Sequence, residues 1–291
     1  EASSYDGINT IETIKSLSSI NHVKVKFKAN CNYNFLHDMQ ELKSSMYKNA
    51  GPIRDANSLN MMLEEINRIV CDRCSDFLFV YHKDYKKNLL KENIKKNVYV
   101  VGNTIIEPCK KILSKISKKK LIKEQYILVD IHRPENFLYK ERLKKIVEYC
   151  SFVKKKFKCK ILFLKFKRTM LQLKKFNIST DEFNFIPLQG YKNYLSLQRD
   201  AFFILSDSGT AQEEPSIFKK PVIVPRDYTE RPQSYKYNCS FKINVNNKNK
   251  SWNNSVLWIN DHNSKKIKCE NKLMGDGKTS FKIAKILELK L

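Results

Sequence analysis

The stretch Phe202-Phe203-Ile204-Leu205-Ser206-Asp207-Ser208-Gly209-Thr210 decides the fold. Its apolar residues 202–205 predict a short buried strand, and the polar turn leads into a helix expected at about residues 211–218. Such a turn directs backbone N–H groups and the positive end of a helix at one point, which suits a phosphate group. An ordinary helix cap by Ser208 or Asp207 explains the same residues equally well.

Short apolar segments and segments of helical spacing alternate on both sides of this stretch. We expect strands at residues 23–27, 77–81, 98–101, 126–131, 161–164, 185–187, 202–205 and 222–224. We expect helices at residues 9–20, 62–70, 83–92, 140–156, 168–175, 193–200, 211–218 and 280–290. This alternation predicts an α/β fold with parallel sheets covered on both faces. The ligands of such sheets bind beyond the carboxyl ends of the strands.

Length and composition limit the class of protein. The 291 residues suggest two domains or one large one, and Gly102-Asn103 is a good place for a crossing between domains. Hydrophobic residues make up 42% of the chain, which excludes wholesale disorder. No run of about 18 apolar residues occurs, so we expect no membrane association. The start lacks a secretory signal and an initiator methionine, which indicates a processed product or a fragment.

The chain carries 55 Lys and Arg against 30 Asp and Glu, a formal charge of +25. Most of these cations are Lys, and they are spread along the chain, as at residues 118–120 and 154–156. A nucleic-acid-binding protein usually gathers its cations on one face, often with Arg reading the bases. We therefore expect a solvated basic surface and no nucleic-acid partner. Polyanion binding is an alternative that a steep salt dependence would reveal.

Cysteine usage points to a reduced compartment. Eight cysteines are too few for a disulfide scaffold in a chain of this length, so we expect a cytoplasmic protein. Cys71 and Cys74 have the spacing of a CxxC motif, but no second CxxC or paired His accompanies them. We therefore expect no metal site.

Two further loops that follow predicted strands carry cations. His132 and Arg133 follow the fourth predicted strand, where a His beside a phosphate can bind the anion and move a proton. Arg226 and Arg231 follow the last predicted strand, and Arg side chains bind phosphate or carboxylate well. A lone His is more often structural, and Arg residues beside acidic residues also form ordinary surface salt bridges.

A predicted helix carries Glu64, Asn67 and Arg68 on one face, because they lie three and four residues apart. Spacing alone favours Glu64 and Arg68 as a helix-stabilising pair. Together with the loops, however, this helix belongs to an ordered set of motifs that resembles the UDP-N-acetylglucosamine 2-epimerase family. The matching segments are residues 64–68 (EEINR), 101–104 (VGNT), 132–136 (HRPEN), 207–214 (DSGTAQEE), 226–232 (RDYTERP) and 275–278 (GDGK). A match to one such motif would be weak evidence for the family, whereas matches to five or six motifs in the same order are specific to it.

The resemblance implies two Rossmann-like domains with parallel sheets, a glycosyltransferase-B-like fold with the active site in the cleft between the domains. We expect a partial N-terminal domain at residues 1–105, a UDP-binding domain at residues 106–279 and a terminal helix at residues 280–291 that crosses back to the first domain. The first domain is incomplete, because nothing matches the opening strand and Gly-Thr-Arg-Pro-Glu loop of the family. A homodimer is also expected.

The activity implied by the resemblance is an isomerase that interconverts UDP-GlcNAc and UDP-ManNAc. In the family, removal of the C2 proton and loss of UDP give a glycal-like intermediate, to which UDP adds again with the other C2 configuration. No cofactor or metal is needed, and a hydrolysing branch of the family releases ManNAc. This chemistry needs carboxylates that move protons and cations that hold the departing diphosphate.

The resemblance also implies a role for each candidate residue. The catalytic candidates are Glu64 as an acid/base carboxylate, His132 at the diphosphate end of the substrate, and Asp6, which lies in a loose match to a second carboxylate motif. The substrate-binding candidates are Ser208 and Gly209 for the phosphate, Glu214 for the ribose, Arg231 near the sugar, and Thr210, Arg68, Arg133 and Arg226.

Some positions depart from the family pattern. A further catalytic Glu of the family falls on Lys28 in one local match and on Asn49 in another, and a later His-Pro pair falls on Lys165-Phe166. These departures leave two alternatives open, a non-catalytic nucleotide-sugar-binding remnant of the family and a UDP-sugar glycosyltransferase of the same fold. UDP release that depends on an added acceptor would favour the transferase.

Overall fold

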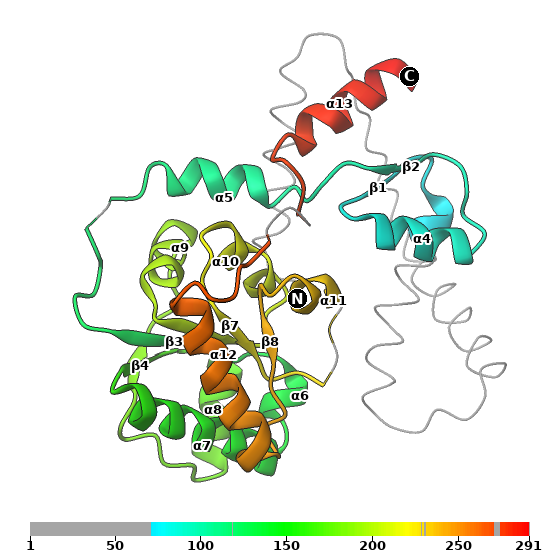
Figure 1. The fold of residues 1–291 in the computed structure, drawn as a ribbon. Coiled ribbons are helices and arrows are strands. Elements are labelled where there is room, and N and C mark those ends of the chain that lie inside the picture. Colours follow the sequence, from blue (N-terminus) through cyan, green and yellow to red (C-terminus); the bar gives the residue numbers. More distant parts are fainter. Residues whose placement is uncertain (1–70, 118, 228, 230, 271–273, 291) are drawn as a thin grey trace, which may run out of the picture. The chain divides into compact units, whose positions relative to one another are not determined.

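The computed structural model describes residues 71–117, 119–227, 229, 231–270 and 274–290 of the chain (Figure 1). The chain divides into two compact units, Glu1–Asp76 with Ala284–Leu291, and Phe77–Ile283. The elements expected at residues 9–20, 23–27 and 62–70 lie outside the described residues. The expected domain boundaries, after residues 105 and 279, stay predictions.

The larger sheet has six parallel strands in the order β5-β4-β3-β6-β7-β8. Its strands are β3 (Tyr126–Asp130), β4 (Lys160–Leu164), β5 (Asn184–Ile186), β6 (Phe203–Ser206), β7 (Val222–Val224) and β8 (Phe241–Lys242). The chain adds strands from β3 toward one edge and then returns to the other side of β3 with β6. The winding therefore reverses between β3 and β6, as in a Rossmann fold, and the predicted parallel α/β sheet is confirmed.

Both faces of this sheet are buried, since side chains along a strand point alternately to opposite sides. Ile127, Val129 and Ile131 pack on one face, whereas Tyr126 and Leu128 pack on the other. The first face is covered by α7 (Lys140–Phe157), α8 (Lys167–Lys175) and α12 (Asn253–Asn263), and the second by α9 (Tyr191–Asp200) and α11 (Pro232–Lys236). This double cover explains why the strands appear in the sequence as continuous apolar runs.

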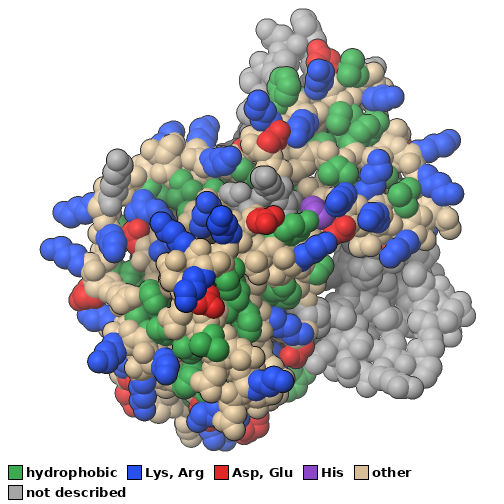
Figure 2. All heavy atoms as spheres, in the orientation of Figure 1, with side chains coloured by type: hydrophobic (Ala, Val, Ile, Leu, Met, Phe, Trp, Pro, Cys, Tyr) green, Lys and Arg blue, Asp and Glu red, His purple; other side chains and the backbone are tan. Residues whose placement is uncertain are grey.

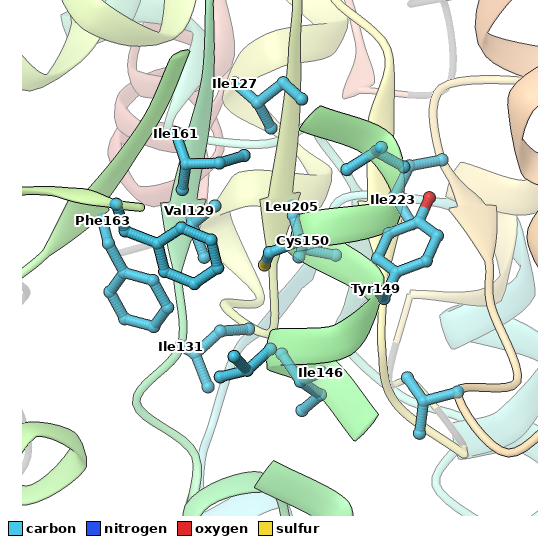
Figure 3. Packing of buried hydrophobic residues seen from close by; sticks show 14 of the residues in the cluster. Ile127, Val129, Ile131, Ile146, Tyr149, Cys150, Ile161, Phe163, Leu205 and Ile223 are labelled. Carbon is cyan, nitrogen blue, oxygen red and sulfur yellow. The ribbon is translucent and has the colours of Figure 1, made fainter. Parts of the chain in front are cut away.

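Helix α7 shows how the sequence pattern produces this cover. Its buried residues recur at helical spacing and are Leu143, Ile146, Val147, Tyr149, Cys150 and Val153. Figure 3 shows Cys150 beside Leu205 of β6, and Ile146 beside Ile131, which follows β3. Its exposed positions carry Lys and Glu residues, so the helix buries one stripe and leaves the other face to water.

A smaller parallel sheet pairs β1 (Leu78–Val80) with β2 (Val98–Val100). Helix α4 (Lys83–Lys91) connects the two strands, and its buried Leu89 packs on both of them. These three elements agree with the predicted ones to within one or two residues. Helix α5 (Ile106–Leu113), which the sequence pattern did not predict, follows.

Two predicted motifs that are far apart in the sequence meet through their backbones. Gly102 and Gly275 have left-handed φ angles of +97° and +98°, and a Cβ atom added to Gly275 would lie 2.8 Å from the Cα atom of Gly102. The N–H of Asn103 donates a hydrogen bond of 2.6 Å to the carbonyl of Met274. Both positions therefore require glycine, for backbone conformation and for space. The chain then enters α13 (Thr279–Lys290).

The helix expected at residues 211–218 is broken in two. One 3₁₀ turn, η1 (Thr210–Gln212), precedes a short α-helix, α10 (Glu214–Ile217). Pro215 has no backbone N–H, and its ring conflicts with the carbonyl four residues earlier. The prediction of one continuous helix is therefore wrong.

Other elements were also absent from the prediction. They are β8, α6 (Pro134–Phe137), α11, the π-helix η2 (Lys248–Trp252) and α12. Most are short, and the strand β8 has only two residues. Elements this short offer too few positions for a period to be recognised.

Charged side chains are spread over the described surface. Figure 2 shows Lys and Arg side chains scattered among apolar and uncharged groups on the face that it presents, with Asp and Glu between them. This distribution is typical of a solvated basic surface rather than of one basic stripe. Among the helices that the structure describes, none has the length and apolar character needed to span a bilayer.

Candidate anion-binding site at the strand ends

The candidate site lies where the winding of the larger sheet reverses. Strands β3 and β6 are neighbours, and the last residue of each, Asp130 and Ser206, are paired in register. The loops that continue from these strands therefore begin side by side at the carboxyl edge of the sheet. Ligands of doubly wound sheets bind at this point.

The buried carboxylate of Asp207 joins the two loops. Its Oδ2 accepts hydrogen bonds from the backbone N–H of Arg133 (3.0 Å) and from Nδ2 of Asn136 (2.9 Å), and its Oδ1 accepts one from the N–H of His132 (3.1 Å). The N–H of Asp207 donates to the carbonyl of Asp130 at 3.1 Å. Burial raises the pKa of Asp207, although the charge of His132 opposes this. These bonds fix the His132 loop against the loop after β6.

Asp130 holds the imidazole of His132. Asp130 Oδ1 lies 2.8 Å from His132 Nδ1, and Asp130 Oδ2 accepts hydrogen bonds from the hydroxyls of Tyr194 (2.7 Å) and Ser206 (3.2 Å). Burial by itself lowers the pKa of His132, but the bond to Asp130 and the charges of Asp130 and Asp207 outweigh it and raise that pKa to about 9. At neutral pH the ring is therefore a cation.

The charged ring has one nitrogen left for a ligand. Because Asp130 engages Nδ1 of His132, Nε2 is the nitrogen that a ligand can use. The side chain of His132 is 31% exposed, and the ring of Phe166 packs against it with centroids 4.7 Å apart. A partly exposed imidazolium at this edge of the sheet can bind an anion and donate a proton to it.

The loop after β6 brings hydroxyl and backbone N–H groups to the same edge. The hydroxyls of Ser208 and Thr210 are 3.0 Å apart, and the N–H of Ser208 donates to Ser206 Oγ at 3.0 Å. The turn η1 begins directly afterwards, and the first N–H groups of a helical turn have no acceptor within that turn. Gly209, Ser208 and Thr210 therefore present donors where the sequence predicted a phosphate site.

Arg231 lies against this loop. A Cβ atom added to Gly209 would be 2.5 Å from Nη1 and 2.8 Å from Cζ of Arg231, so a side chain at residue 209 would displace the guanidinium. Nε of Arg231 donates to Glu213 Oε1 at 2.6 Å, and its backbone N–H donates to Thr229 Oγ1 at 3.0 Å. The loop after β7 thus contributes a cation beside the loop after β6.

Arg142 and Arg226 tie the loop after β7 to the loop after β3. Arg142 donates from Nε to Asn136 Oδ1 at 3.0 Å and from Nη2 to the carbonyl of Pro225 at 2.9 Å. Nε of the buried Arg226 is 3.3 Å from Glu135 Oε1. All three strand-end loops are therefore connected by direct contacts between their residues.

Glu214 is a buried carboxyl group at the start of α10. Its Oε2 accepts a hydrogen bond of 3.2 Å from Nε2 of Gln198. Burial raises the pKa of Glu214 to about 7, although the nearby Tyr191 hydroxyl and the hydrogen bond from Gln198 oppose this. The carboxyl therefore changes charge near neutral pH, where it could exchange hydrogen bonds with a polar ligand.

A family model described as UDP-N-acetylglucosamine 2-epimerase matches residues 49–288. This chain belongs to the UDP-N-acetylglucosamine 2-epimerase family. The UDP-N-acetylglucosamine 2-epimerase of Methanocaldococcus jannaschii is 36% identical over 242 residues, which cover 78% of this chain and 64% of that protein. The UDP-N-acetylglucosamine 2-epimerase of Methanococcus maripaludis is 33% identical over 237 residues, which cover 71% of this chain and 63% of that protein. The chain thus spans slightly less than two thirds of the length of these relatives.

Solved structures of the family have the same fold. The crystal structure of M. jannaschii UDP-GlcNAc 2-epimerase in complex with UDP-GlcNAc and UDP matches with a TM-score of 0.68 and 33% identity, covering 78% of this chain and 64% of that one. The Neisseria meningitidis enzyme bound to UDP-GlcNAc matches with a TM-score of 0.68 and 27% identity, covering 82% and 68%. These matches confirm the expected glycosyltransferase-B-like fold.

The described part of this UDP-GlcNAc 2-epimerase family member includes most of the predicted site residues. His132, Ser208, Gly209, Thr210 and Arg231 lie on connected loops at the strand ends. Arg133, Arg226 and Glu214 lie beside them, with the backbone of Arg133 and the side chains of the other two bound to protein groups. Glu64, Arg68 and Asp6 lie outside the described residues. The role of each residue in this family member stays a prediction.

Several residues of the site were missed by sequence reasoning. Asp130, Tyr194, Asp207 and Arg142 hold the predicted residues in place but were not among the candidates. One signal was available, because Asp130 is a charged residue at the end of an otherwise apolar buried strand. Tyr194 and Arg142 lie on helices that have one solvent-facing side, so a polar residue there is ordinary and does not point to a functional site.

Asp130, His132 and Asp207 also meet the distance requirement for a metal site, because one ligand atom from each lies within 4.8 Å of the others. However, these atoms already exchange hydrogen bonds with one another, with hydroxyls and with backbone N–H groups. The arrangement satisfies each carboxylate without an ion. The absence of a metal requirement in this family member stays a prediction.

Proposed function

We propose that this chain is a nucleotide-sugar epimerase that interconverts UDP-GlcNAc and UDP-ManNAc by elimination and re-addition of UDP. Family membership supports the reaction class. The observation that carries the proposal is the buried Asp207, which holds the His132 loop and the Ser208–Thr210 loop together at the winding reversal of the sheet. This edge gathers donors of the kind that a diphosphate requires.

Two cations would stabilise the departing UDP. The imidazolium of His132 would donate from Nε2 to the diphosphate, because Asp130 keeps the ring charged through Nδ1. Arg231 would add a second positive charge from the opposite loop. Charge that develops on the leaving diphosphate is then met by groups already in position, which lowers the barrier to elimination.

Carboxylates would move the C2 proton. Glu64 and Asp6 are the candidates for this step, on the strength of the motifs that they occupy in the sequence. Removal of a proton from C2 and its return to the other face require an acid and a base that act on opposite faces of the sugar. Glu214 would bind the ribose, and Ser208 and Gly209 would hold phosphate oxygens.

Incubation with UDP-GlcNAc in D₂O tests the proposal. The epimerase predicts UDP-ManNAc that carries deuterium at C2, detected by NMR and mass spectrometry, because the C2 proton exchanges with solvent during elimination. Glu64→Gln should abolish product, while Glu141→Gln, at an exposed position on α7, should leave the rate unchanged. Conversion without deuterium at C2 would contradict the elimination mechanism.

The alternatives have separate outcomes when UDP binding and the effect of an added acceptor are measured beside this incubation. If the protein binds UDP but leaves UDP-GlcNAc unchanged, this would favour a non-catalytic binding protein of the family. UDP release that appears only with an added acceptor would favour a glycosyltransferase. Release of free ManNAc would assign the chain to the hydrolysing branch.

Assembly and location are further parts of the proposal. We expect a homodimer, which light scattering coupled to size-exclusion chromatography would detect as twice the chain mass of 34.3 kDa. We also expect a cytoplasmic location, since the eight cysteines are too few for a disulfide scaffold in a chain of this length. A monomer at assay concentration would contradict the first expectation.

A further inference from the structure

Two cysteines that lie apart from the proposed diphosphate site are in direct contact. The Sγ atoms of Cys269 and Cys239 are 2.8 Å apart and share a hydrogen bond, and both residues are buried. Cys239 follows α11 and Cys269 follows α12, so the pair joins two segments 30 residues apart. The N–H of Glu270 donates to the carbonyl of Tyr237 at 3.0 Å, which holds the two segments together.

His262 lies near Cys269 and is the candidate base for this pair. Its side chain is buried in the last turn of α12, and neither ring nitrogen has a hydrogen-bond partner of normal geometry among the residues described. The hydrogen bond with Cys239 lowers the pKa of the Cys269 thiol; burial opposes this, and the nearby His262 lowers it further. A thiolate at Cys269 is the nucleophile that cysteine redox chemistry requires.

We propose that Cys239 and Cys269 form a reversible disulfide whose oxidant is a small peroxide. The two sulfurs need to approach by less than about 1 Å to reach the disulfide bond length of about 2.05 Å. A small oxidant suits the site, because the buried sulfurs leave little room for a bulky disulfide such as oxidised glutathione. The proposal does not depend on the activity proposed for the strand-end site.

The steps balance with hydrogen peroxide. The Cys269 thiolate attacks one peroxide oxygen, the O–O bond breaks, and Cys269 becomes a sulfenic acid. The hydroxide that leaves takes the proton that the thiol gave to His262 and becomes water. The Cys239 sulfur then attacks the sulfenic sulfur: an S–S bond forms, the S–O bond breaks, and the departing hydroxide takes the Cys239 thiol proton and leaves as a second water. Two thiols thus lose two electrons to one peroxide.

The disulfide would link segments that lead to the candidate site. Arg231 is the residue directly before α11, and Sγ of Cys269 lies 3.9 Å from the carbonyl oxygen of Ser216 in α10. A covalent link here restricts the unfolded chain and fixes these segments to one another. The oxidised protein should therefore unfold at a higher temperature than the reduced protein.

Peptide mapping of the full chain tests the proposal. The reduced protein is freed of reductant, treated with equimolar hydrogen peroxide, alkylated in denaturant and digested without reduction. We expect one cross-linked peptide pair through Cys239 and Cys269, and a fall in alkylatable cysteines from eight to six. Dithiothreitol should restore all eight. Oxidation of the exposed pair Cys71 and Cys74, with Cys239 and Cys269 both alkylated, would overturn the proposal.

Variants separate the role of each group. Cys269→Ala should abolish the cross-link, whereas Cys159→Ala, at a buried position directly before β4, should leave it intact. His262→Gln should slow cross-linking at least about tenfold without changing the final product, because the imidazole acts only as a base. A cross-link that forms at the wild-type rate in His262→Gln would overturn the role of His262. The wild-type map decides the main proposal even if a variant fails to fold.

Discussion

At the scale of single residues, the contact between Asp130 and His132 sets the charge of the candidate site. Asp130→Asn removes the negative charge 2.8 Å from Nδ1, so we expect the pKa of His132 to fall from about 9 toward its ordinary value of about 6.5. An NMR titration of the imidazole protons measures this, with His132→Gln to assign the signal. Asp181→Asn, at an exposed position, is the control. An unchanged titration in Asp130→Asn would contradict the assignment.

The same contact predicts a pH dependence of stability. Because the folded pKa of His132 is raised, its stabilising contribution is complete below about pH 6.5 and is lost as the pH rises through about 9. We expect the free energy of unfolding of the wild type to fall across that window relative to Asp130→Asn. Urea unfolding at several pH values within it measures the difference. Parallel curves for the two proteins would count against the raised pKa.

The contribution of Glu214 to the free energy of unfolding should also be lost as the pH rises, but over a lower pH range. Burial raises its pKa to about 7, so its contribution is complete below about pH 4.5 and is lost as the pH rises through 7. Glu214→Gln cannot ionise, and its stability relative to wild type should increase over that range by on the order of 3 kcal/mol. Urea unfolding tests this, with Glu141→Gln as the exposed control. No gain above pH 7 would contradict a buried, titrating Glu214.

At the scale of elements, α8 offers a matched pair for testing the core. Leu173 is 4% exposed and packs on the sheet, whereas Leu171 on the same helix is 57% exposed. Leu173→Ala should lower the free energy of unfolding by about 2–5 kcal/mol, because it removes buried surface and leaves a cavity. Leu171→Ala should change it by less than about 0.5 kcal/mol. Equal losses in urea unfolding would show that α8 does not pack as described.

The elements that sequence reasoning recovered are those with a clear pattern. The central strands and α7 were found because a continuous apolar run is typical of a buried strand and a regular apolar stripe is typical of a helix. Helix α12 was missed because its buried face carries the polar Ser255 and His262, while Leu257 is exposed. The break before α10 could have been predicted, since Pro215 was visible in the sequence.

The candidate site could also be predicted only in part from the sequence. The three loops could be placed at one edge because parallel strands all end there, and the motifs named His132 and Arg231. The hydrogen bonds from Tyr194 to Asp130 and from Arg142 to Asn136 join groups at least six residues apart, and only the folded chain brings them together. Sequence patterns report faces and ends of elements, not which polar groups meet across them.

At the scale of the whole molecule, the approach of Gly102 to Gly275 joins segments far apart in the chain. Gly102→Ala places a Cβ atom 2.9 Å from Thr279 Oγ1 on a backbone with φ of +97°, so we expect a loss of more than about 1 kcal/mol in the free energy of unfolding. Gly190→Ala is the control, because no atom lies within 4 Å of its added Cβ, and it should cost less than about 0.5 kcal/mol. Similar thermal unfolding of the two variants would contradict the close approach.

We propose that the three strand-end loops form one binding site for the diphosphate of UDP. Isothermal titration calorimetry with UDP tests it most directly, on the wild type and on His132→Gln, Arg231→Gln and the exposed control Lys155→Gln. We predict saturable binding to the wild type and the control, and at least a tenfold weaker affinity, about 1.4 kcal/mol, for each of the other two variants. UDP that binds all four proteins equally, or that fails to bind the wild type, would contradict the claim.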